Sequence, residues 1–237
     1  MKTKTAKLTS TLIEKNKHAI LLLYFPVYLI GFGYLEKTVT THFHVIHMDL
    51  DVYIPFCEYF IIPYLLWFGY VAWGVVYFYF KNKDEYFRLC TALFTGMTVF
   101  LIVSFFYPNG HYLRPATFER DNIFVEIVKQ LYSTDTATNL FPSIHVYNSI
   151  VVNFSVWHAA NFKEKKAVRY ASALLMISIV LSTVFLKQHS VFDLITGVVL
   201  ATVVYRLVYG SNAIRFPAET CTARRTTYDK KRASQKP

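Results

Sequence analysis

The stretch YASALLMISIVLSTVFLKQHSVFDLITGVVLATVVY, residues 170–205, decides the fold. It consists of two apolar runs, 170–184 and 194–205, joined by the polar segment FLKQHSVFD at 185–193. The first run lies in the predicted span 169–187 and the second in the predicted span 190–209, and each span has about the 20 residues that cross a bilayer as a helix. Two spanning helices joined by so few residues must make a tight turn at one membrane face. The segment therefore places a Lys, a His and an Asp at a membrane surface.

The composition of the whole chain also indicates a membrane protein. Of the 237 residues, 54% are hydrophobic and 17% are charged, whereas about 25% of the residues of soluble domains are charged. Long apolar runs separated by short charged segments predict an all-α, polytopic membrane protein. We expect six transmembrane helices, at residues 19–36, 54–80, 89–107, 142–160, 169–187 and 190–209.

The distribution of basic residues predicts the orientation of these spans. Most Lys and Arg residues lie in the N-terminal segment, in the loops 81–88 and 163–169, and in the C-terminal tail. In a six-span protein these four segments lie on one side, which the positive-inside rule makes cytoplasmic. We therefore expect two cytoplasmic termini, with a basic segment 1–18, a six-helix membrane domain 19–210 and a basic, mobile tail 211–237.

The net charge of +10 would suggest a nucleic-acid partner in a soluble chain. Here no nucleic-acid motif and no stacking aromatic residues accompany the basic residues, so we expect contact with anionic lipid headgroups and no nucleic acid. The three cysteines show neither a CxxC spacing nor a disulfide pattern. His42, His44 and His47 lie close together and could bind a metal, but three His in a wet polar loop more often bind nothing specific.

Polar groups that suit phosphate chemistry fall on the extracytoplasmic side, at the ends of three predicted spans. They are Arg114, Ser143, His145, Lys187, His189 and Asp193. His189 and Asp193 are four residues apart, so on a helix they would share a face. A carboxylate there orients the imidazole and makes its other nitrogen a better nucleophile or base. Arg114 and Lys187 supply positive charge for a phosphate, and Ser143 lies at a helix N-terminus, which favours an anion.

Several of these residues also have purely structural interpretations. Ser190 and Asp193 fit a capping box at the start of the last span, and a Lys or Arg near a helix end often only extends to the interface. Glu58 lies early in the second predicted span, where a carboxylate is a functional candidate. It could bind an acceptor polyol, pair with Arg114, or equally sit in interfacial water. The joint pattern favours function, because ionisable groups beside apolar spans are costly unless they work together.

The long extracytoplasmic segment 108–141 has features of its own. DNIFVEIVKQLY, residues 121–132, has an amphipathic pattern that predicts a short interfacial helix. His111 and Asp135 lie in the same segment and could line the mouth of a site, although a plain loop position is the commoner case.

The order and spacing of these residues resemble the type 2 phosphatidic acid phosphatase superfamily, whose members are six-helix lipid phosphate phosphatases. That family carries three motifs: Lys, six residues and Arg-Pro; Pro-Ser-Gly-His; and Ser-Arg, five residues, His, three residues and Asp. Arg114-Pro115, residues 142–145 and residues 182–193 match them here, within a resemblance that spans roughly 54–209. Three motif positions depart from the pattern, with Tyr107 for Lys, Ile144 for Gly and Thr183 for Arg.

The departures make the chain more similar to a divergent branch of that superfamily. This branch includes inositol phosphoceramide synthase-like and sphingomyelin synthase-like phosphotransferases, which keep the two His and the Asp. The resemblance implies that His189 attacks phosphorus and that Asp193 orients it. It implies that His145 protonates the leaving oxygen and then activates water or an acceptor hydroxyl.

The resemblance also implies how the phosphate is held. Arg114, Lys187 and the region of Ser143 would bind its oxygens. Glu58 is a further substrate-binding candidate, toward an acceptor polyol and not toward the phosphate. Lys187 lies one turn from Thr183, so on a helix it would reach the place of the family's missing Arg. No metal or other cofactor is implied.

These inferences predict an enzyme that acts on lipids. We expect an integral membrane lipid phosphatase of the plasma membrane, which hydrolyses a lipid phosphate or diphosphate at the extracytoplasmic face through a phosphohistidine. Its partners would be that substrate and the surrounding lipids. Phosphatidic acid, phosphatidylglycerol phosphate and polyprenyl diphosphate all fit. The alternatives are a lipid headgroup phosphotransferase, similar to inositol phosphoceramide synthase, and a catalytically silent relative.

Overall fold

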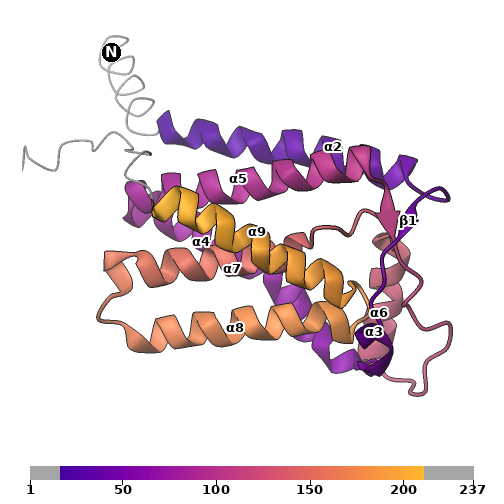
Figure 1. Cartoon of the computed structure of the whole chain (residues 1–237). Coiled ribbons are helices and arrows are strands. Elements are labelled where there is room, and N and C mark those ends of the chain that lie inside the picture. Colours follow the sequence, from indigo (N-terminus) through magenta and orange to yellow (C-terminus); the bar gives the residue numbers. More distant parts are fainter. Residues whose placement is uncertain (1–16, 211–237) are drawn as a thin grey trace, which may run out of the picture.

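The computed structural model describes residues 17–210, which form a bundle of long helices with short elements gathered at one end (Figure 1). The expected basic segment, up to residue 16, and the expected tail 211–237 lie outside the described residues. The elements are η1 (Lys17–Leu23), α2 (Tyr24–Thr38), β1 (His44–Val45), α3 (Leu50–Tyr53), η2 (Glu58–Phe60), α4 (Ile61–Lys81), α5 (Lys83–Phe106), β2 (Asn109–Gly110), α6 (Ile123–Thr134), α7 (Ile144–His158), η3 (Ala160–Phe162), α8 (Lys166–Phe185) and α9 (Val191–Tyr209).

The all-α prediction is confirmed, since the described chain is mostly helical. Five of its helical segments are long and apolar enough to cross a membrane. The one remaining predicted span, 142–160, which is the fourth in chain order, forms α7, which has 15 residues. At 1.5 Å per residue α7 is about 22 Å long, shorter than the ~30 Å of a bilayer's hydrocarbon core. A sixth span and the orientation in the membrane therefore stay predictions.

Helix α7 is the centre of the bundle. It contacts α4, α5, α8 and α9, and most of its side chains are buried. The closest approach is at Gly96 of α5, where a Cβ atom would lie 2.1 Å from the ring of Tyr147. The Tyr147 hydroxyl donates to the backbone oxygen of Ala92 at 2.5 Å. Only glycine at position 96 leaves room for this ring, which fixes α7 against α5.

The predicted loop at 81–88 is wrong. Helix α4 ends at Lys81 and α5 begins at Lys83, so one residue joins them. Asn82 caps α5, because its side-chain oxygen accepts a hydrogen bond from the backbone N–H of Glu85 at 3.1 Å. An Asn cap followed by acidic residues in the first turn is a strong helix start. That local signal extends the third predicted span, 89–107, backwards to residue 83.

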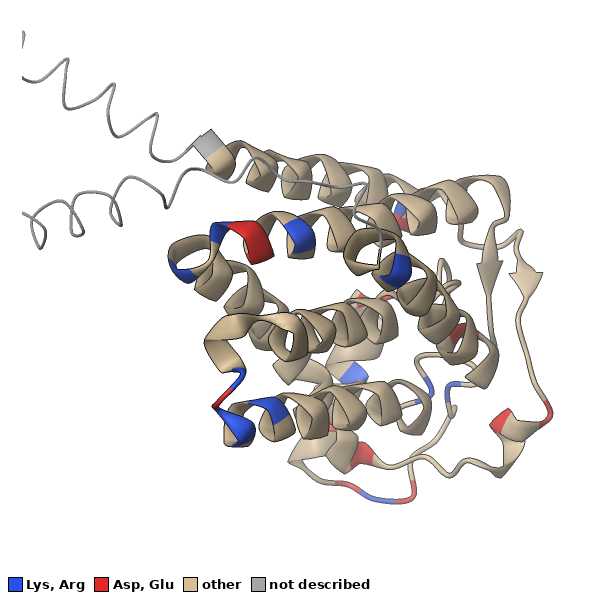
Figure 2. Ribbon diagram, turned by 60° about the vertical axis from the view of Figure 1, so that its left-hand side comes forward, with Lys and Arg blue, Asp and Glu red and all other residues tan. Residues whose placement is uncertain are grey.

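Two ends of the bundle differ in composition. We call the end formed by residues 81–83 and 159–165 the basic end, and the end formed by 39–57, 107–143 and 186–190 the loop end. Lys and Arg dominate near the basic end, both signs of charge mix at the loop end, and the helices between carry few charges (Figure 2). This pattern agrees with the predicted cytoplasmic basic end.

The loop end is ordered by short contacts between distant segments. Strands β1 and β2 pair in parallel. The predicted amphipathic helix at 121–132 is present as α6, and its buried Val125 and Val128 face the bundle. Val128 packs in one cluster with Ile61 of α4 and Leu186. The segment 107–143 thereby covers the ends of α4 and α8.

Candidate active site

The polar turn between α8 and α9 holds the first two candidate site residues, His189 and Asp193. Helix α8 ends at Phe185, and α9 begins after its N-cap, Ser190. The Ser190 hydroxyl accepts from the backbone N–H of Phe192 at 3.2 Å, and Asp193 Oδ2 accepts from the backbone N–H of Ser190 at 3.0 Å. The predicted capping box is confirmed. His189 lies just before the helix, so the expectation that it shares a helical face with Asp193 is wrong.

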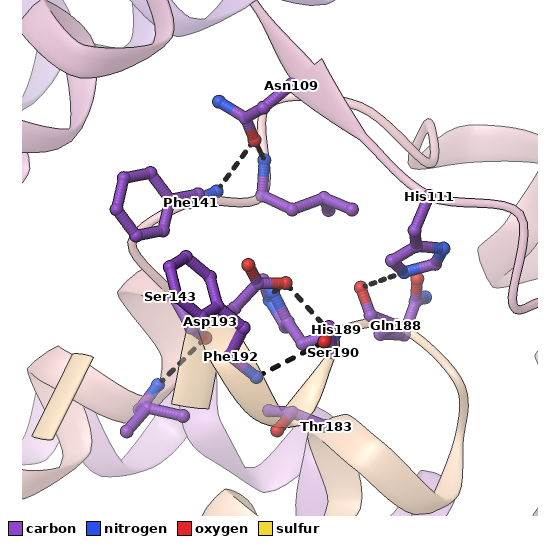
Figure 3. Close-up of polar contacts among 12 residues, drawn as sticks. Asn109, His111, Phe141, Ser143, Thr183, Gln188, His189, Ser190, Phe192 and Asp193 are labelled. Atoms are coloured by element: carbon purple, nitrogen blue, oxygen red, sulfur yellow. Dashed lines mark hydrogen bonds and ion pairs between the residues drawn. The ribbon is translucent and has the colours of Figure 1, made fainter. Parts of the chain in front are cut away.

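His189 and Asp193 nevertheless meet. His189 Nδ1 lies 3.4 Å from Asp193 Oδ2, the oxygen that also caps the helix (Figure 3). At that distance the contact is a weak one. His189 Nδ1 and Asp193 Oδ1 are both buried and form no hydrogen bond with residues 17–210. With Nδ1 facing the carboxylate, Nε2 is the ring nitrogen left for chemistry.

His145 comes from the start of α7. Its neighbour Ser143 is the N-cap, with its Oγ accepting from the backbone N–H of Val146 at 3.4 Å. The backbone N–H of Ser143 donates to the backbone oxygen of Asp193 at 3.3 Å, which ties the start of α7 to α9. As a result the rings of His145 and His189 lie edge to face, with their centroids 5.7 Å apart. Two histidines separated by 44 positions in the chain therefore form one pair.

Both histidines line a cavity of about 340 Å³ between α2, α4, α5, α6 and α7. The His145 ring lies 4.6 Å from the ring of Tyr64 and 4.3 Å from that of Trp67. Leu29 of α2 and Phe68 of α4 also line the cavity, yet are 62% and 59% exposed. The cavity therefore reaches the outer surface between these two apolar helices. Its remaining lining residues are Tyr28, Phe32, Phe100, Leu131, Thr134, Asp135, Thr138, Asn139, Leu140 and Ile144.

Arg114 is held beside this cavity by four hydrogen bonds. Its Nη1 donates to the backbone oxygens of Tyr132 at 3.2 Å and Asp135 at 2.8 Å, and its Nη2 donates to that of Thr136 at 2.9 Å. Nη2 also donates to Gln188 Oε1 at 2.5 Å. Burial lowers the pKa of Arg114, although a guanidinium stays charged. Only its Nε–H has no partner within the described chain.

Part of the chain matches the model of a known protein family. Residues 111–216 match the family model of the PAP2 superfamily. This part of the chain belongs to the PAP2 superfamily. Arg114, His145, His189 and Asp193 all fall inside the matched region, and the predicted membership is confirmed. No curated protein and no solved structure matches the chain. PAP2 proteins are phosphatases or phosphotransferases that act on phosphate esters, which supports an enzyme of that general class.

Lys187 of this PAP2 region points away from the cavity. Its backbone φ is 52°, in the left-handed region, so it does not continue α8, and the expected shared helix face with Thr183 is wrong. Its ammonium donates to the backbone oxygens of Asp51 at 2.7 Å and Ile54 at 2.5 Å. Partial burial lowers the pKa of Lys187. A phosphate contact by Lys187 stays a prediction that would require a change of partners.

Glu58 is buried outside the cavity lining. Its Oε1 accepts from Arg120 Nη1 and from Asn122 Nδ2, both at 3.0 Å. Of the alternatives for Glu58, pairing with Arg114 is wrong, because that guanidinium donates to backbone oxygens at the end of α6 and just after it. Glu58 instead joins the start of α4 to the loop before α6. Its role toward an acceptor stays a prediction.

Asp51 is a buried carboxylate at the start of α9 that no sequence pattern singles out. Its Oδ2 accepts from Ser190 Oγ at 2.6 Å and from the backbone N–H of Met48 at 2.8 Å. Its Oδ1 accepts from the backbone N–H of Val191 at 2.7 Å. Asp51 thus caps α9 from a segment almost 140 positions away. No motif spacing marks it, since the contact depends on how residues 39–57 fold.

The histidines of the loop end have different surroundings. His44 stacks on Tyr107, with the ring centroids 4.3 Å apart. Tyr107 is the residue that stands where the family motif has Lys. His47 Nδ1 lies 3.4 Å from Asp51 Oδ2. His42 is exposed. No cluster of three or more His, Cys, Asp or Glu suited to a metal occurs within residues 17–210.

His111 is a buried histidine that contacts the turn between α8 and α9. Its Nδ1 accepts from the backbone N–H of Leu113 at 3.2 Å, so its Nε2–H donates to the backbone oxygen of Gln188 at 3.0 Å (Figure 3). Burial is the main cause that lowers the pKa of His111 to about 4. His111 is therefore neutral near pH 7 and holds the residue that precedes His189.

Proposed function

We propose that the protein is a membrane lipid phosphatase, which hydrolyses a lipid phosphate or diphosphate at the extracytoplasmic surface through a phosphohistidine. One observation carries this proposal. His145 and His189 line the same mostly apolar cavity, and Asp193 lies 3.4 Å from His189. A nucleophile, a carboxylate that orients it and a separate acid or base are the groups that phosphoryl transfer through a covalent intermediate needs.

In the first step His189 Nε2 attacks phosphorus and the bond from phosphorus to the lipid oxygen breaks. The Asp193 carboxylate accepts from Nδ1–H and stabilises the positive charge that develops on the ring. Protonated His145 gives its proton to the leaving oxygen, so a lipid phosphate departs as the lipid alcohol and a lipid diphosphate departs as the lipid monophosphate. The products of this step are the released lipid, neutral His145 and a phosphoryl group on His189.

In the second step water attacks the phosphohistidine. His145, now neutral, takes a proton from the water as the new phosphorus–oxygen bond forms. The bond between phosphorus and His189 Nε2 breaks, inorganic phosphate leaves, and both histidines return to their starting states. One histidine thus acts in turn as acid and as base.

Positive charge for the phosphate would come from groups at the edge of the cavity. Arg114 is one candidate, since its Nε–H has no partner within residues 17–210, and the N-terminal turn of α7 after Ser143 would add backbone N–H groups. Lys187 would contribute only after leaving its two carbonyls. Such hydrogen bonds act on the charge that develops in the transition state.

The cavity wall suits a lipid. Its aromatic side chains would contact acyl or prenyl chains, and its opening between α2 and α4 lies on a face of apolar, exposed residues such as Leu29 and Phe68. A lipid could then bring its phosphate to the histidines with its tails still in the bilayer. We place the protein in the plasma membrane, with the loop end outside the cytoplasm.

The test is phosphate release by the purified full-length chain from a panel of lipid phosphates and diphosphates. The expected result is release that the His189→Gln variant lacks. A set of parallel reactions contains glycerol or inositol as acceptors. If the phosphoryl group passes to the added alcohol in place of water, the protein is a phosphotransferase. Absence of turnover with every lipid would overturn the proposal.

A further inference from the structure

The cavity has a polar wall that the proposed reaction does not use. Thr134, Asp135, Thr138 and Asn139 all line it, and all follow from the end of α6. A phosphate carries only acceptor oxygens at neutral pH, or nearly so. Whether this wall offers donors or acceptors therefore decides what it can bind.

Its donors are already committed to protein groups. Asn139 Nδ2 donates to Glu36 Oε1 at 3.1 Å, and the Thr138 hydroxyl donates to the backbone oxygen of Val39 at 2.9 Å. Glu36 Oε2 accepts from the hydroxyl of Thr136 at 2.6 Å. The carboxylate of Glu36 fixes the amide orientation of Asn139, because only its NH₂ side can face that carboxylate.

The polar wall also has hydrogen-bond acceptors that no protein group satisfies fully. Asn139 Oδ1 is buried and has no hydrogen-bond partner within residues 17–210. The carboxylate of Asp135 lines the cavity, while Arg114 binds the backbone oxygen of Asp135 instead. Burial raises the pKa of Asp135, against the opposing effects of Arg114 and of the Tyr64 hydroxyl. One phenol cannot fill the four lone-pair sites of a carboxylate.

We propose that Asp135 and Asn139 bind a hydrogen-bond donor, a hydroxyl or ammonium group, that accompanies the phosphate in the cavity. This inference rests on the proposed function and deepens it, since it names the class of substrate. The donor belongs either to the headgroup of the lipid phosphate or to an acceptor alcohol. A lipid phosphate without such a group would leave both acceptors unpaired and place its anion near a carboxylate.

The first experiment compares two substrates with matched acyl chains. Phosphatidylglycerol phosphate carries a free hydroxyl beside its phosphomonoester, and phosphatidic acid carries none. For the wild type we expect a higher kcat/KM with phosphatidylglycerol phosphate. For Asp135→Asn we expect that preference to fall by about tenfold, as one charged hydrogen bond is lost, while turnover of phosphatidic acid does not fall because a repulsive charge is removed. General damage to the site would lower both rates together.

Two further arms identify the source of the donor. Phosphatidic acid is incubated with glycerol or with ethanolamine, and transfer of the phosphoryl group to the added alcohol is measured. Loss of transfer in Asp135→Asn assigns the donor to an acceptor, and glycerol against ethanolamine separates hydroxyl from ammonium. Glu126→Gln is the matched control, because it removes a carboxylate from the exposed face of the same helix α6. It should leave every ratio unchanged.

A binding measurement separates this inference from the proposed function. Short-chain forms of both lipids are titrated into His189→Gln protein, with the fluorescence of Trp67 at the cavity wall as the signal. A preference for the glycerol headgroup that Asp135→Asn abolishes supports the inference even if no lipid is hydrolysed. If phosphate is released but Asp135→Asn changes neither the substrate ratio nor the binding ratio, the inference is wrong and the phosphatase stands.

Discussion

Both ends of the helix bundle place a histidine against a buried carboxylate. At the basic end His158 Nδ1 lies 3.0 Å from Glu85 Oε2. At the loop end His189 Nδ1 lies 3.4 Å from Asp193 Oδ2. The first pair joins α7 to α5, and the second lies where α9 begins. By residue type alone the two sites are alike.

Their hydrogen bonding differs. Glu85 Oε1 also accepts from the Tyr209 hydroxyl at 2.7 Å, and that hydroxyl lies 2.7 Å from Ser155 Oγ. At the loop end His189 Nδ1 and Asp193 Oδ1 form no hydrogen bond within the described chain, and the ring borders a cavity. A satisfied polar cluster stabilises a fold, whereas chemistry needs free atoms beside open space.

The largest effect expected from this difference is on turnover. His189→Gln should reduce phosphate release to background, and His145→Gln should reduce it by roughly 10²- to 10⁴-fold, the usual contribution of an acid or base. His158→Gln is the matched change at the basic end. It should keep turnover but lower the free energy of unfolding by about 1–3 kcal/mol, since the buried carboxylate of Glu85 loses a hydrogen-bond partner. Equal loss of turnover in His158→Gln would break the comparison.

The carboxylates provide the next largest contrast. Asp193→Asn keeps a side-chain oxygen for the cap but no longer stabilises a charged His189, so kcat should fall by about 10²- to 10⁴-fold. Glu85→Gln should leave kcat nearly unchanged and lower thermal stability. Both variants are measured by phosphate release and by thermal unfolding in the same detergent. If kcat were unchanged in Asp193→Asn, Asp193 would serve only as part of the N-terminal cap of α9.

His111 is a satisfied histidine at the loop end, so its effect should be on stability. Its pKa lies near 4 in the folded protein and near 6.5 when unfolded. Because the unfolded chain binds the proton more readily, stability is complete above pH 6.5 and is lost as the pH falls toward 4. The loss amounts to roughly 3 kcal/mol over that window. Thermal unfolding of His111→Gln should depend less on pH than that of the wild type, whereas exposed His42→Gln should match the wild type.

Lys187 should show the smallest effect on turnover. Its ammonium binds the backbone oxygens of Asp51 and Ile54, so Lys187→Met should lower the melting temperature and reduce kcat by less than about tenfold, a loss no larger than one hydrogen bond. Adding Thr183→Arg should not restore kcat. A large loss of kcat at unchanged melting temperature would instead assign Lys187 to the phosphate, as the family's pattern suggests.

The sequence predicts those parts of the fold and site that depend on local order. Apolar length gives the helices, and motif spacing selects His145, His189 and Asp193, whose contacts follow from the starts of α7 and α9. The loop end is different, because its contacts join distant segments. Three features of this end illustrate the point: the hydrogen bond between Asp51 and Ser190, the ion pair between Arg120 and Glu58, and the position of Asp135 in the cavity wall. They depend on how segments 39–57 and 107–143 fold, and a hydrophobic periodicity does not predict that folding. The start of α5 after its N-cap Asn82 differs from the predicted span 89–107, because the charged residues at 83–88 are typical of a loop between two spans.

The central claim is that His189 carries the phosphoryl group, and trapping it is the most direct test. His145→Gln protein is incubated with phosphatidic acid or phosphatidylglycerol phosphate labelled in the phosphomonoester, quenched in alkali and digested for mass spectrometry. Without His145 to activate water, the intermediate should persist. The account predicts an alkali-stable, acid-labile label on the peptide that contains His189, and no label in the variant that also carries His189→Gln. A label on another residue, or none while the wild type releases phosphate, would contradict it.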